Sequence, residues 1–299
     1  MPSCCDAALA MGESGRHSAG MDAPDALTLP RPMSQPPRAR GEVVVSAKVA
    51  GGVTRLGDLR QQGSLKALFP RGAGPALDVV TLNTAGGLTS GDAMRLTATA
   101  RAGAQMRLTT QAAERAYRAA GDPPARVESR LVAEDGARID WLPQETILFD
   151  GARLERKLVM DLAPTATALL VEPLLFGRLA RGEQVREGRL LDRWEVRRDG
   201  RLVFADALRL GGDMAATLDR PGVGGGARAV ASVLFAGAAA EAHLDAARAL
   251  LAGSGGASLI AEGVLFARLM APDGYALRAA LVPLICRLTG AALPKVWTL

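Results

Sequence analysis

The pattern in this sequence that most suggests chemistry is the glycine-rich run Gly86–Ala93, GGLTSGDA. Gly86 and Gly91 have the spacing of a phosphate-binding P-loop. In that motif a lysine follows the second glycine and a Mg²⁺-binding serine or threonine comes next, whereas this chain has Asp92 and Ala93. A carboxylate at the lysine position would repel a polyphosphate strongly in a poorly solvated site. We therefore expect no nucleotide hydrolysis at this run.

Residues that hold metal ions tightly or act as nucleophiles are scarce. The chain has three cysteines and two histidines, and it contains no G-x-S-x-G nucleophile elbow. Cys286 stands alone near the C-terminus, and His243 has no sequence context that would make it a general base. The sequence therefore predicts no zinc or nickel cluster and no tightly bound cofactor. A carboxylate-dependent hydrolase stays open, because paired acids are recognised by their separation in space.

Composition and charge exclude several classes of protein. The 299 residues are 48% hydrophobic and 22% charged, which is typical of a folded globular chain. The net charge of +5 does not indicate nucleic-acid binding, because the arginines are spread along the chain and only 4% of residues are aromatic. No apolar run is long enough to span a membrane, and few cysteines favour a reducing compartment. We expect a cytoplasmic protein.

Residues 1–41 are expected to form a poorly ordered extension before a single domain over residues 42–299. The extension is rich in proline and has no sustained hydrophobic periodicity. It contains Cys4, Cys5 and His17, which could form a loose metal-binding tail. An incidental extension is the better interpretation, because flexible ligands lose much conformational entropy when a metal orders them.

The elements that must position the remaining residues are mainly strands. Apolar and polar residues alternate over 43–48 and 94–101, as in strands with one buried face. Asp135-Gly136 and Asp199-Gly200 each separate two alternating runs, and Asp-Gly is a strong signal for a β-hairpin. The spacing of these signals predicts a mostly β body. We find no repeat of fixed period of the kind that identifies a solenoid.

Helical patterns appear near the C-terminus. Helices are predicted over about 242–252 and 276–288, the second with Pro283 inside it. Four leucines of the second helix share one face. Such a stripe either packs on the chain's own sheet or forms a docking face for a partner, and the pattern alone favours the first interpretation. The four residues are Leu277, Leu281, Leu284 and Leu288.

Several blocks, taken in order, resemble the UreD family of urease accessory proteins, called UreH in some organisms. Each block is weak by itself, but together they span about residues 42–299, so their combination is specific. The first 41 residues lie outside the resemblance. The blocks are Asn83–Asp92, Thr109–Glu114, Tyr117-Arg118, Trp141–Ala152, Glu172, Gly177-Arg178, Arg181–Glu183 and Leu293–Trp297.

The resemblance implies a fold, partners and a function. It implies a β-helix-like stack of strands with a few helices toward the C-terminus. It also implies a non-catalytic maturation factor that links a UreF-type protein and a UreG-type GTPase to apo-urease and assists nickel delivery, with Ni²⁺ bound only transiently. Carboxylate, carbonyl and water ligands would hold Ni²⁺ weakly enough for release. The alternative is a plain protein-binding scaffold without a metal role.

The resemblance also implies roles for individual residues. The glycines of the run are expected to form a tight turn that allows close approach of a neighbouring backbone. Five carboxylates are candidates for an internal nickel route, although Arg178 or Arg181 could instead pair with Glu172 or Glu183 in a structural role. The leucine stripe becomes a candidate contact for the UreF-type partner. The glycines are Gly86, Gly87 and Gly91, and the carboxylates are Asp92, Glu145, Asp150, Glu172 and Glu183.

Overall fold

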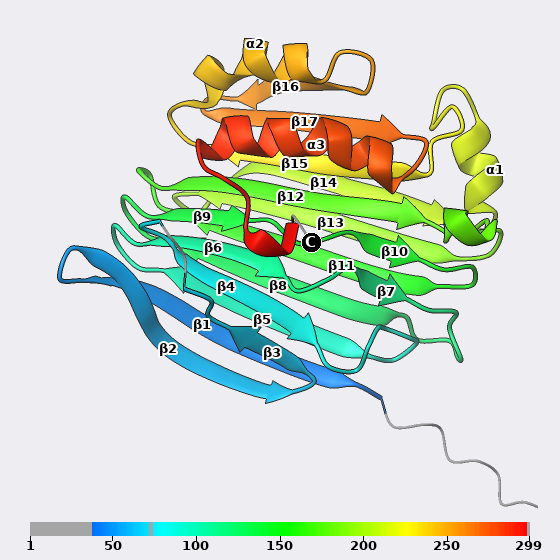
Figure 1. Ribbon diagram of the computed structural model, residues 1–299, viewed down its shortest axis with the longest axis horizontal. Coiled ribbons are helices and arrows are strands. Elements are labelled where there is room, and N and C mark those ends of the chain that lie inside the picture. The colour runs from blue at the N-terminus through cyan, green and yellow to red at the C-terminus, as the bar shows by residue number, and fades with distance from the viewer. Residues whose placement is uncertain (1–37, 72–73, 298–299) are drawn as a thin grey trace, which may run out of the picture. The chain divides into compact units, whose positions relative to one another are not determined.

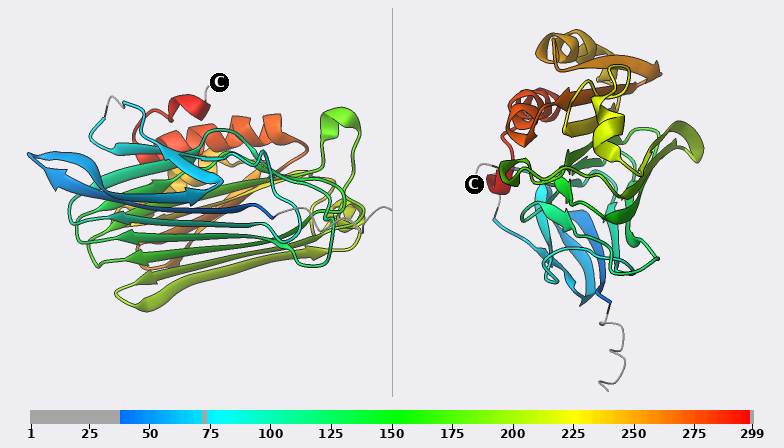
Figure 2. Two further views of the ribbon diagram at one scale, coloured as in Figure 1. Left: turned by 90° about the horizontal axis from the view of Figure 1, so that it is seen from below. Right: turned by 90° about the vertical axis from the view of Figure 1, so that its right-hand side faces the viewer.

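A computed structural model describes residues 38–71 and 74–297 of the chain. Within these residues, strands form two main sheets that face each other (Figures 1 and 2). The first sheet has the order β14 (Arg201–Gly211), β13 (Arg189–Arg198), β11 (Arg153–Leu162), β8 (Ala125–Ala133), β5 (Ala93–Ala100), β1 (Arg40–Ala50) and β2 (Val53–Gly63). The second has the order β16 (Gly255–Ala261), β17 (Val264–Ala271), β15 (Ala229–Ala236), β12 (Thr167–Phe176), β9 (Arg138–Trp141), β6 (Gln105–Thr110), β4 (Leu77–Asn83) and β3 (Leu65–Leu68).

The middle of the chain is a β-solenoid-like stack, which confirms the fold expected from the resemblance. The chain passes repeatedly from one sheet to the other, so β5, β8, β11 and β13 run parallel in the first sheet and β4, β6, β9 and β12 in the second. Two short strands, β7 (Glu114–Ala116) and β10 (Thr146–Leu148), pair at the turns. The starts of β4, β6, β9 and β12 are 28, 33 and 29 residues apart. These unequal spacings explain why the sequence shows no fixed period.

The two Asp-Gly signals have different outcomes. Asp199-Gly200 joins β13 to β14 in an antiparallel hairpin, and both residues have positive φ (50° and 72°), as predicted. The hairpin prediction at Asp135-Gly136 is wrong, because β8 and β9 belong to different sheets. Only Gly136 has positive φ there, and the Gly103 N–H donates to the Asp135 carbonyl at 2.9 Å. That bond stacks the turn on the one before it, so Asp135-Gly136 is a solenoid corner.

The predicted helices are present with slightly different ends. Helix α2 covers Ala240–Leu250 and α3 covers Gly274–Thr289, while the short α1 covers Met214–Asp219. The Ala276 N–H donates to the Asp273 carboxylate at 2.7 Å at the start of α3, and Gly290 ends the helix with φ 65°. One-turn 3₁₀ helices lie at Leu179–Arg181 and Lys295–Trp297. Helices α2 and α3 pack on the second sheet (Figure 1).

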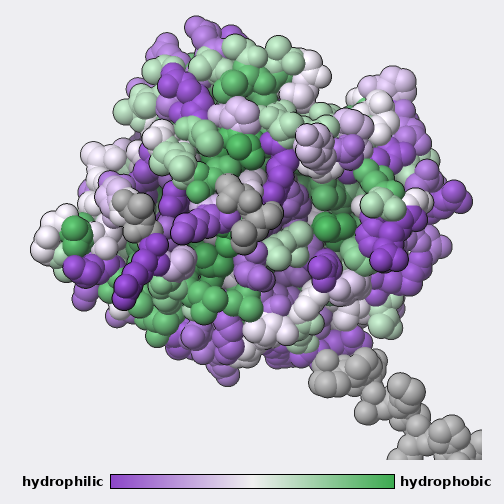
Figure 3. Space-filling model, viewed as in Figure 1, coloured by the Kyte–Doolittle hydropathy of each residue, from purple (hydrophilic) through white to green (hydrophobic). Residues whose placement is uncertain are grey.

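The leucine stripe of α3 lies inside the chain's own core. All four side chains are at most 2% exposed and pack in an apolar cluster with the second sheet and α2. Burial leaves them no surface to offer, so a partner of α3 would meet the helix's outer face. The outside of α2 and α3 carries apolar residues among hydrophilic ones (Figure 3), and Tyr275 at the start of α3 is 86% exposed.

The start of the domain falls slightly earlier than predicted. Strand β1 begins at Arg40 and pairs with β5 from that residue onward. Cys4, Cys5 and His17 lie outside the described residues. No helix in the described part of the chain is long and apolar enough to cross a membrane.

Candidate functional site

Several of the sequence blocks that carry the family resemblance lie next to one another along one side of the solenoid. The Leu88 N–H donates to the Arg115 carbonyl at 2.7 Å, and the Tyr117 N–H donates back to the Leu88 carbonyl at 2.8 Å. One turn further, the Phe149 N–H donates to the Ala116 carbonyl, and the Gly177 N–H donates to the Leu148 carbonyl. Blocks that are about 30 residues apart in sequence are therefore stacked neighbours, because each belongs to the next turn of the stack.

The glycine run is a tight turn against its neighbour. Gly86, Gly87 and Gly91 have φ of 78°, 149° and 82°, values that favour glycine. A Cβ at Gly87 would lie 2.3 Å from the Tyr117 ring and 2.8 Å from the Arg115 carbonyl oxygen. A side chain at position 87 would therefore push the two turns apart.

Asp92 holds this turn in place. Its Oδ1 accepts from the Ala39 N–H and its Oδ2 from the Thr89 N–H, both at 2.8 Å, and the residue is 5% exposed. Both carboxylate oxygens are thus occupied by backbone donors. The carboxylate that replaces the P-loop lysine joins the start of β1 to the glycine run.

An interior cavity of about 90 Å³ lies among residues of the two sheets. Polar side chains from both sheets reach it, including Glu172 on β12 and Arg156 on β11. A second pocket, of about 210 Å³, has Leu65, Thr81, Thr110 and Glu114 in common with it. Further polar residues of the cavity wall are Trp141, Gln144 and Thr146.

A buried charge cluster lies at the inner end of the cavity. Arg156 Nη2 is 2.8 Å from Glu172 Oε2 and 2.5 Å from Asp192 Oδ2, and all three side chains are at most 8% exposed. Trp141 Nε1 donates to Glu172 Oε1 at 3.0 Å, and Arg156 Nη1 donates to Thr146 Oγ1 at 3.0 Å. Burial raises the pKa of Glu172 to about 7, although Arg156 opposes this shift. The cluster therefore has a carboxyl group whose charge changes near neutral pH.

Glu114 lines both the cavity and the second pocket. Its Oε1 accepts from the Arg115 N–H at 2.9 Å and its Oε2 from Asn83 Nδ2 at 3.2 Å. Burial raises the pKa of Glu114 despite these hydrogen bonds. Glu114 ends the block Thr109–Glu114, but no feature of the sequence distinguishes it as a site residue. Only the fold shows that its side chain reaches the cavity.

The other predicted carboxylates are dispersed and paired. Glu145 Oε1 lies 2.8 Å from Arg278 Nε, and Glu183 accepts two hydrogen bonds of 2.9 Å from the Arg178 guanidinium. Asp150 accepts from two backbone N–H groups and from an arginine. Of the expected pairs, Arg178 with Glu183 is formed, whereas Glu172 pairs with Arg156. No three His, Cys, Asp or Glu side chains within the described ranges could together hold a metal ion.

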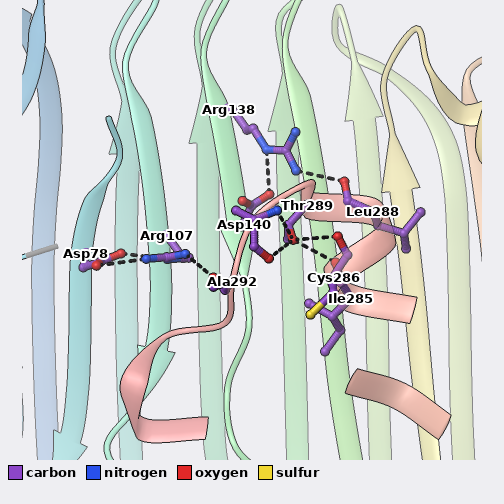
Figure 4. Close-up of polar contacts among 10 residues, drawn as sticks. Asp78, Arg107, Arg138, Asp140, Ile285, Cys286, Leu288, Thr289 and Ala292 are labelled. Carbon is purple, nitrogen blue, oxygen red and sulfur yellow. Dashed lines mark hydrogen bonds and ion pairs between the residues drawn. The ribbon is translucent and has the colours of Figure 1, made fainter. Parts of the chain in front are cut away.

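Hydrogen bonds hold the C-terminal block, Leu293–Trp297, beside the cavity wall. Arg107 makes two contacts with Asp78, at 2.7 and 3.0 Å, and donates to the Ala292 carbonyl, while Arg138 donates to the Leu288 carbonyl (Figure 4). Trp297 Nε1 donates to the Leu142 carbonyl at 3.0 Å. Arginines on β6 and β9 of the second sheet thus bind the end of α3 and the segment after it. Gln144 Nε2, from the cavity wall, donates to the Val296 carbonyl at 2.9 Å.

Comparison with known proteins agrees with the motif pattern. A family model described as UreD urease accessory protein matches residues 39–298. The chain is 50% identical over 263 residues to the urease accessory protein UreD of Xanthobacter autotrophicus, covering 87% of this chain and 90% of the relative. It is 48% identical over 268 residues to that of Methylobacterium sp., covering 87% and 95%. For Roseobacter denitrificans the identity is 45% over 268 residues, covering 90% and 97%.

Proposed function

The chain belongs to the UreD family of urease accessory proteins, and we propose that it is a non-catalytic scaffold that assists nickel delivery to urease. Membership of the family supports a role in urease maturation. The proposed partners are a UreF-type protein, a UreG-type GTPase that binds through it, and apo-urease. In this proposal the nucleotide chemistry belongs to the GTPase, in keeping with Asp92 at the position of the P-loop lysine.

The interior cavity is the observation that supports the nickel step. Its wall is mostly apolar, but a few side chains offer carboxylate, hydroxyl and amide oxygens, and Glu114 also lines the second pocket. Oxygen ligands bind Ni²⁺ less tightly than imidazole or thiolate ligands in proteins. Nickel is the cargo in this proposal, so weak ligands are useful because they allow release.

The structure narrows the set of carboxylates on the proposed route. Both carboxylate oxygens of Asp92, Asp150 and Glu183 accept hydrogen bonds from backbone groups or arginine side chains. Neither these three residues nor Glu145 lines the interior cavity, whereas Glu114 and Glu172 do. We therefore place Glu172, from the predicted set, and Glu114 on the route.

Arg156 has a defined part in this scheme. With Glu172 and Asp192 both ionised, the cluster carries a net charge of −1, because the guanidinium neutralises one carboxylate. A buried pair of carboxylates without a cation would bind a divalent metal far more tightly. Arg156 thus keeps the inner end of the cavity attractive to Ni²⁺ without turning it into a storage site.

A reconstituted activation assay tests the nickel step. The double variant Glu114→Gln/Glu172→Gln keeps the shape of both side chains and removes their charge. With UreF-type and UreG-type proteins and apo-urease present, we expect activation to be about tenfold slower, which corresponds to roughly 1.4 kcal/mol in a barrier. The nickel content of urease should fall in parallel. Glu262→Gln, at an exposed turn, is the matched control.

Partner binding by the double variant distinguishes the scaffold role from the nickel route. The double variant should still bind its partners, because Glu172 is buried and Glu114 is only partly exposed. Normal nickel loading by the double variant would contradict the route and favour the plain scaffold. Loss of partner binding by a folded double variant would mean that the two carboxylates act in assembly instead.

The hydrolase alternative has little support in the geometry. Glu172 and Asp192 both contact Arg156, so a guanidinium occupies the space between them. The cavity of about 90 Å³ is smaller than typical substrate pockets, which measure roughly 300–1,000 Å³. No room is left for a sugar ring and an attacking water.

A further inference from the structure

The turns that carry the family blocks also form an open surface pocket that the nickel route does not use. This pocket, which we call the arginine pocket, measures about 780 Å³. It is made by three successive turns of the stack, on the side where these blocks lie next to one another. Its lining includes Tyr117, Arg118, Phe149, Arg178, Glu183 and Arg186.

The carboxylates of the arginine pocket are already saturated. Asp150 Oδ1 accepts from the N–H groups of Arg186 and Glu187 at 2.8 and 2.9 Å, and its Oδ2 accepts from Arg118 Nη2. Glu183 uses both oxygens on the Arg178 guanidinium. These acids therefore orient the loop and its arginines, and they have little capacity left for a bound cation.

The guanidinium groups, in contrast, have unused donors. Within the described structure, Arg178 Nη1 has no hydrogen-bond partner, and the guanidinium of Arg186 contacts only Gln184 Oε1, at 3.5 Å. Arg181 is exposed next to Gly182 of the lining and forms no ion pair there. The lining arginines are Arg118, Arg178 and Arg186, and the lining carboxylates are Asp150 and Glu183, so the lining has one more positive than negative group. Spare N–H donors and positive charge together select an anionic acceptor.

An apolar wall lies beside these donors. The Tyr117 and Phe149 rings meet edge to face with centroids 4.9 Å apart, and the Arg178 guanidinium lies 4.3 Å over the Phe149 ring. Tyr117 is itself fixed by its hydroxyl, which donates to the Gly86 carbonyl at 3.1 Å. The arginine and both rings are therefore held in position before any ligand arrives, which lowers the entropy cost of binding.

We propose that the arginine pocket binds an acidic segment of a partner protein. Carboxylate side chains of that segment would accept from Arg178 and Arg186, and an adjoining apolar side chain would lie against Phe149 and Tyr117. The open shape and the aromatic wall favour a peptide over a small inorganic anion. The inference rests on the proposed function only in that the partner is a protein of urease maturation.

Direct peptide binding tests this proposal. The probe is a fluorescein-labelled octapeptide of glutamates with one central phenylalanine, measured by anisotropy against the full-length chain. We expect saturable binding that weakens strongly between 50 and 500 mM salt, because the contacts are largely exposed to solvent. A lysine peptide of the same design should not bind. Failure of the glutamate peptide to bind at 50 mM salt would overturn the proposal.

A pair of charge-reversed variants locates the binding site. Arg181→Glu/Arg186→Glu changes one arginine of the lining and one exposed arginine next to the lining residue Gly182, without breaking an ion pair of the described structure. We expect it to weaken peptide binding about tenfold or more. Arg55→Glu/Arg201→Glu makes the same change in net charge elsewhere on the surface and should alter binding less than about twofold. Equal losses in both variants would show that only net charge matters and would contradict the pocket. Thermal melts establish that both variants are folded.

Competition distinguishes the peptide from a phosphate ligand. Sodium tripolyphosphate should displace the glutamate peptide only weakly. Binding of tripolyphosphate tighter than that of the peptide would overturn the choice of a protein segment. The peptide measurement needs neither urease nor nickel. Its outcome is therefore independent of the Glu114/Glu172 activation test, and either proposal can fail without the other.

Discussion

Two arginine–carboxylate groups in this protein have similar contacts but opposite electrostatics. In the interior, Arg156 lies 2.8 Å from Glu172, and burial raises the pKa of Glu172 to about 7. At the surface, Arg178 lies 2.9 Å from Glu183, and hydrogen bonds from Arg178 lower the pKa of Glu183. The contact distances are nearly equal, so distance does not explain the difference. Burial of Glu172 costs more hydration energy than Arg156 returns, and the charge of Asp192 raises the pKa of Glu172 further. In the outer group the Arg178 side chain is 44% exposed.

This contrast suggests two uses for the same chemistry. In the interior, a carboxylate that is costly to ionise is suited to transient contact with a cation. At the surface, a carboxylate that stays ionised fixes an arginine whose remaining donors face solvent. The following predictions test the contrast, from the largest expected effect to the smallest.

Removal of the inner arginine should have the largest effect. Arg156→Met leaves Glu172 and Asp192 buried without a counterion, and we expect a loss of about 3–5 kcal/mol in the free energy of unfolding, measured by urea denaturation. Adding Glu172→Gln and Asp192→Asn should restore part of this loss. A variant Arg156→Met as stable as the wild type would contradict the assigned charge cluster.

The second-largest effect should be the pH dependence of stability, which differs between the Glu172 and Glu183 groups. The pKa of Glu172 is higher in the folded chain, about 7, than its ordinary value of 4.5, so its contribution to stability is present below about pH 4.5 and lost as pH rises through about 7. Between pH 4.5 and 8 the wild type should lose about 3 kcal/mol more than Glu172→Gln. If the free energy of unfolding changes equally with pH in the two proteins over this range, the raised pKa of Glu172 is contradicted.

The surface pair should have the smallest effect. Glu183 has a lowered pKa in the folded chain, so its contribution is present above its unfolded pKa and lost as pH falls below that range. Because Arg178 is largely solvated, Glu183→Gln should lower the Tm by roughly 2 °C or less, and the difference should shrink further in 0.5 M salt. A loss as large as that of Arg156→Met would remove the contrast between the two regions.

Particular residues show how far sequence reasoning reaches. The hairpin at Asp199-Gly200 and helices α2 and α3 follow from local signals, because turn chemistry and helical periodicity involve neighbours in the chain. Asp135-Gly136 carries the same dipeptide but forms a corner between two sheets. The local signal predicts a change of direction there, and pairing with other turns decides which strand comes next.

In the candidate site, too, the sequence predicts contacts between residues that are close in the chain but not those that the fold creates. The pair Arg178–Glu183 spans five residues and was anticipated, whereas the partner of Glu172 is Arg156, which lies on a different strand of the other sheet. Glu114 was overlooked because nothing in its neighbourhood shows that it borders a cavity. The leucine stripe of α3 was visible as a stripe, but only packing shows that it faces inward.

By itself, the sequence determined the family, the mostly β body, the C-terminal helices and the absence of a P-loop lysine. These properties depend on residue types at short spacing or on blocks in a fixed order. Only the tertiary structure decided which carboxylates are occupied, which one is buried beside an arginine, and which arginines keep free donors. The stack of turns brings together residues about 30 positions apart, and desolvation then acts on whichever groups lie inside.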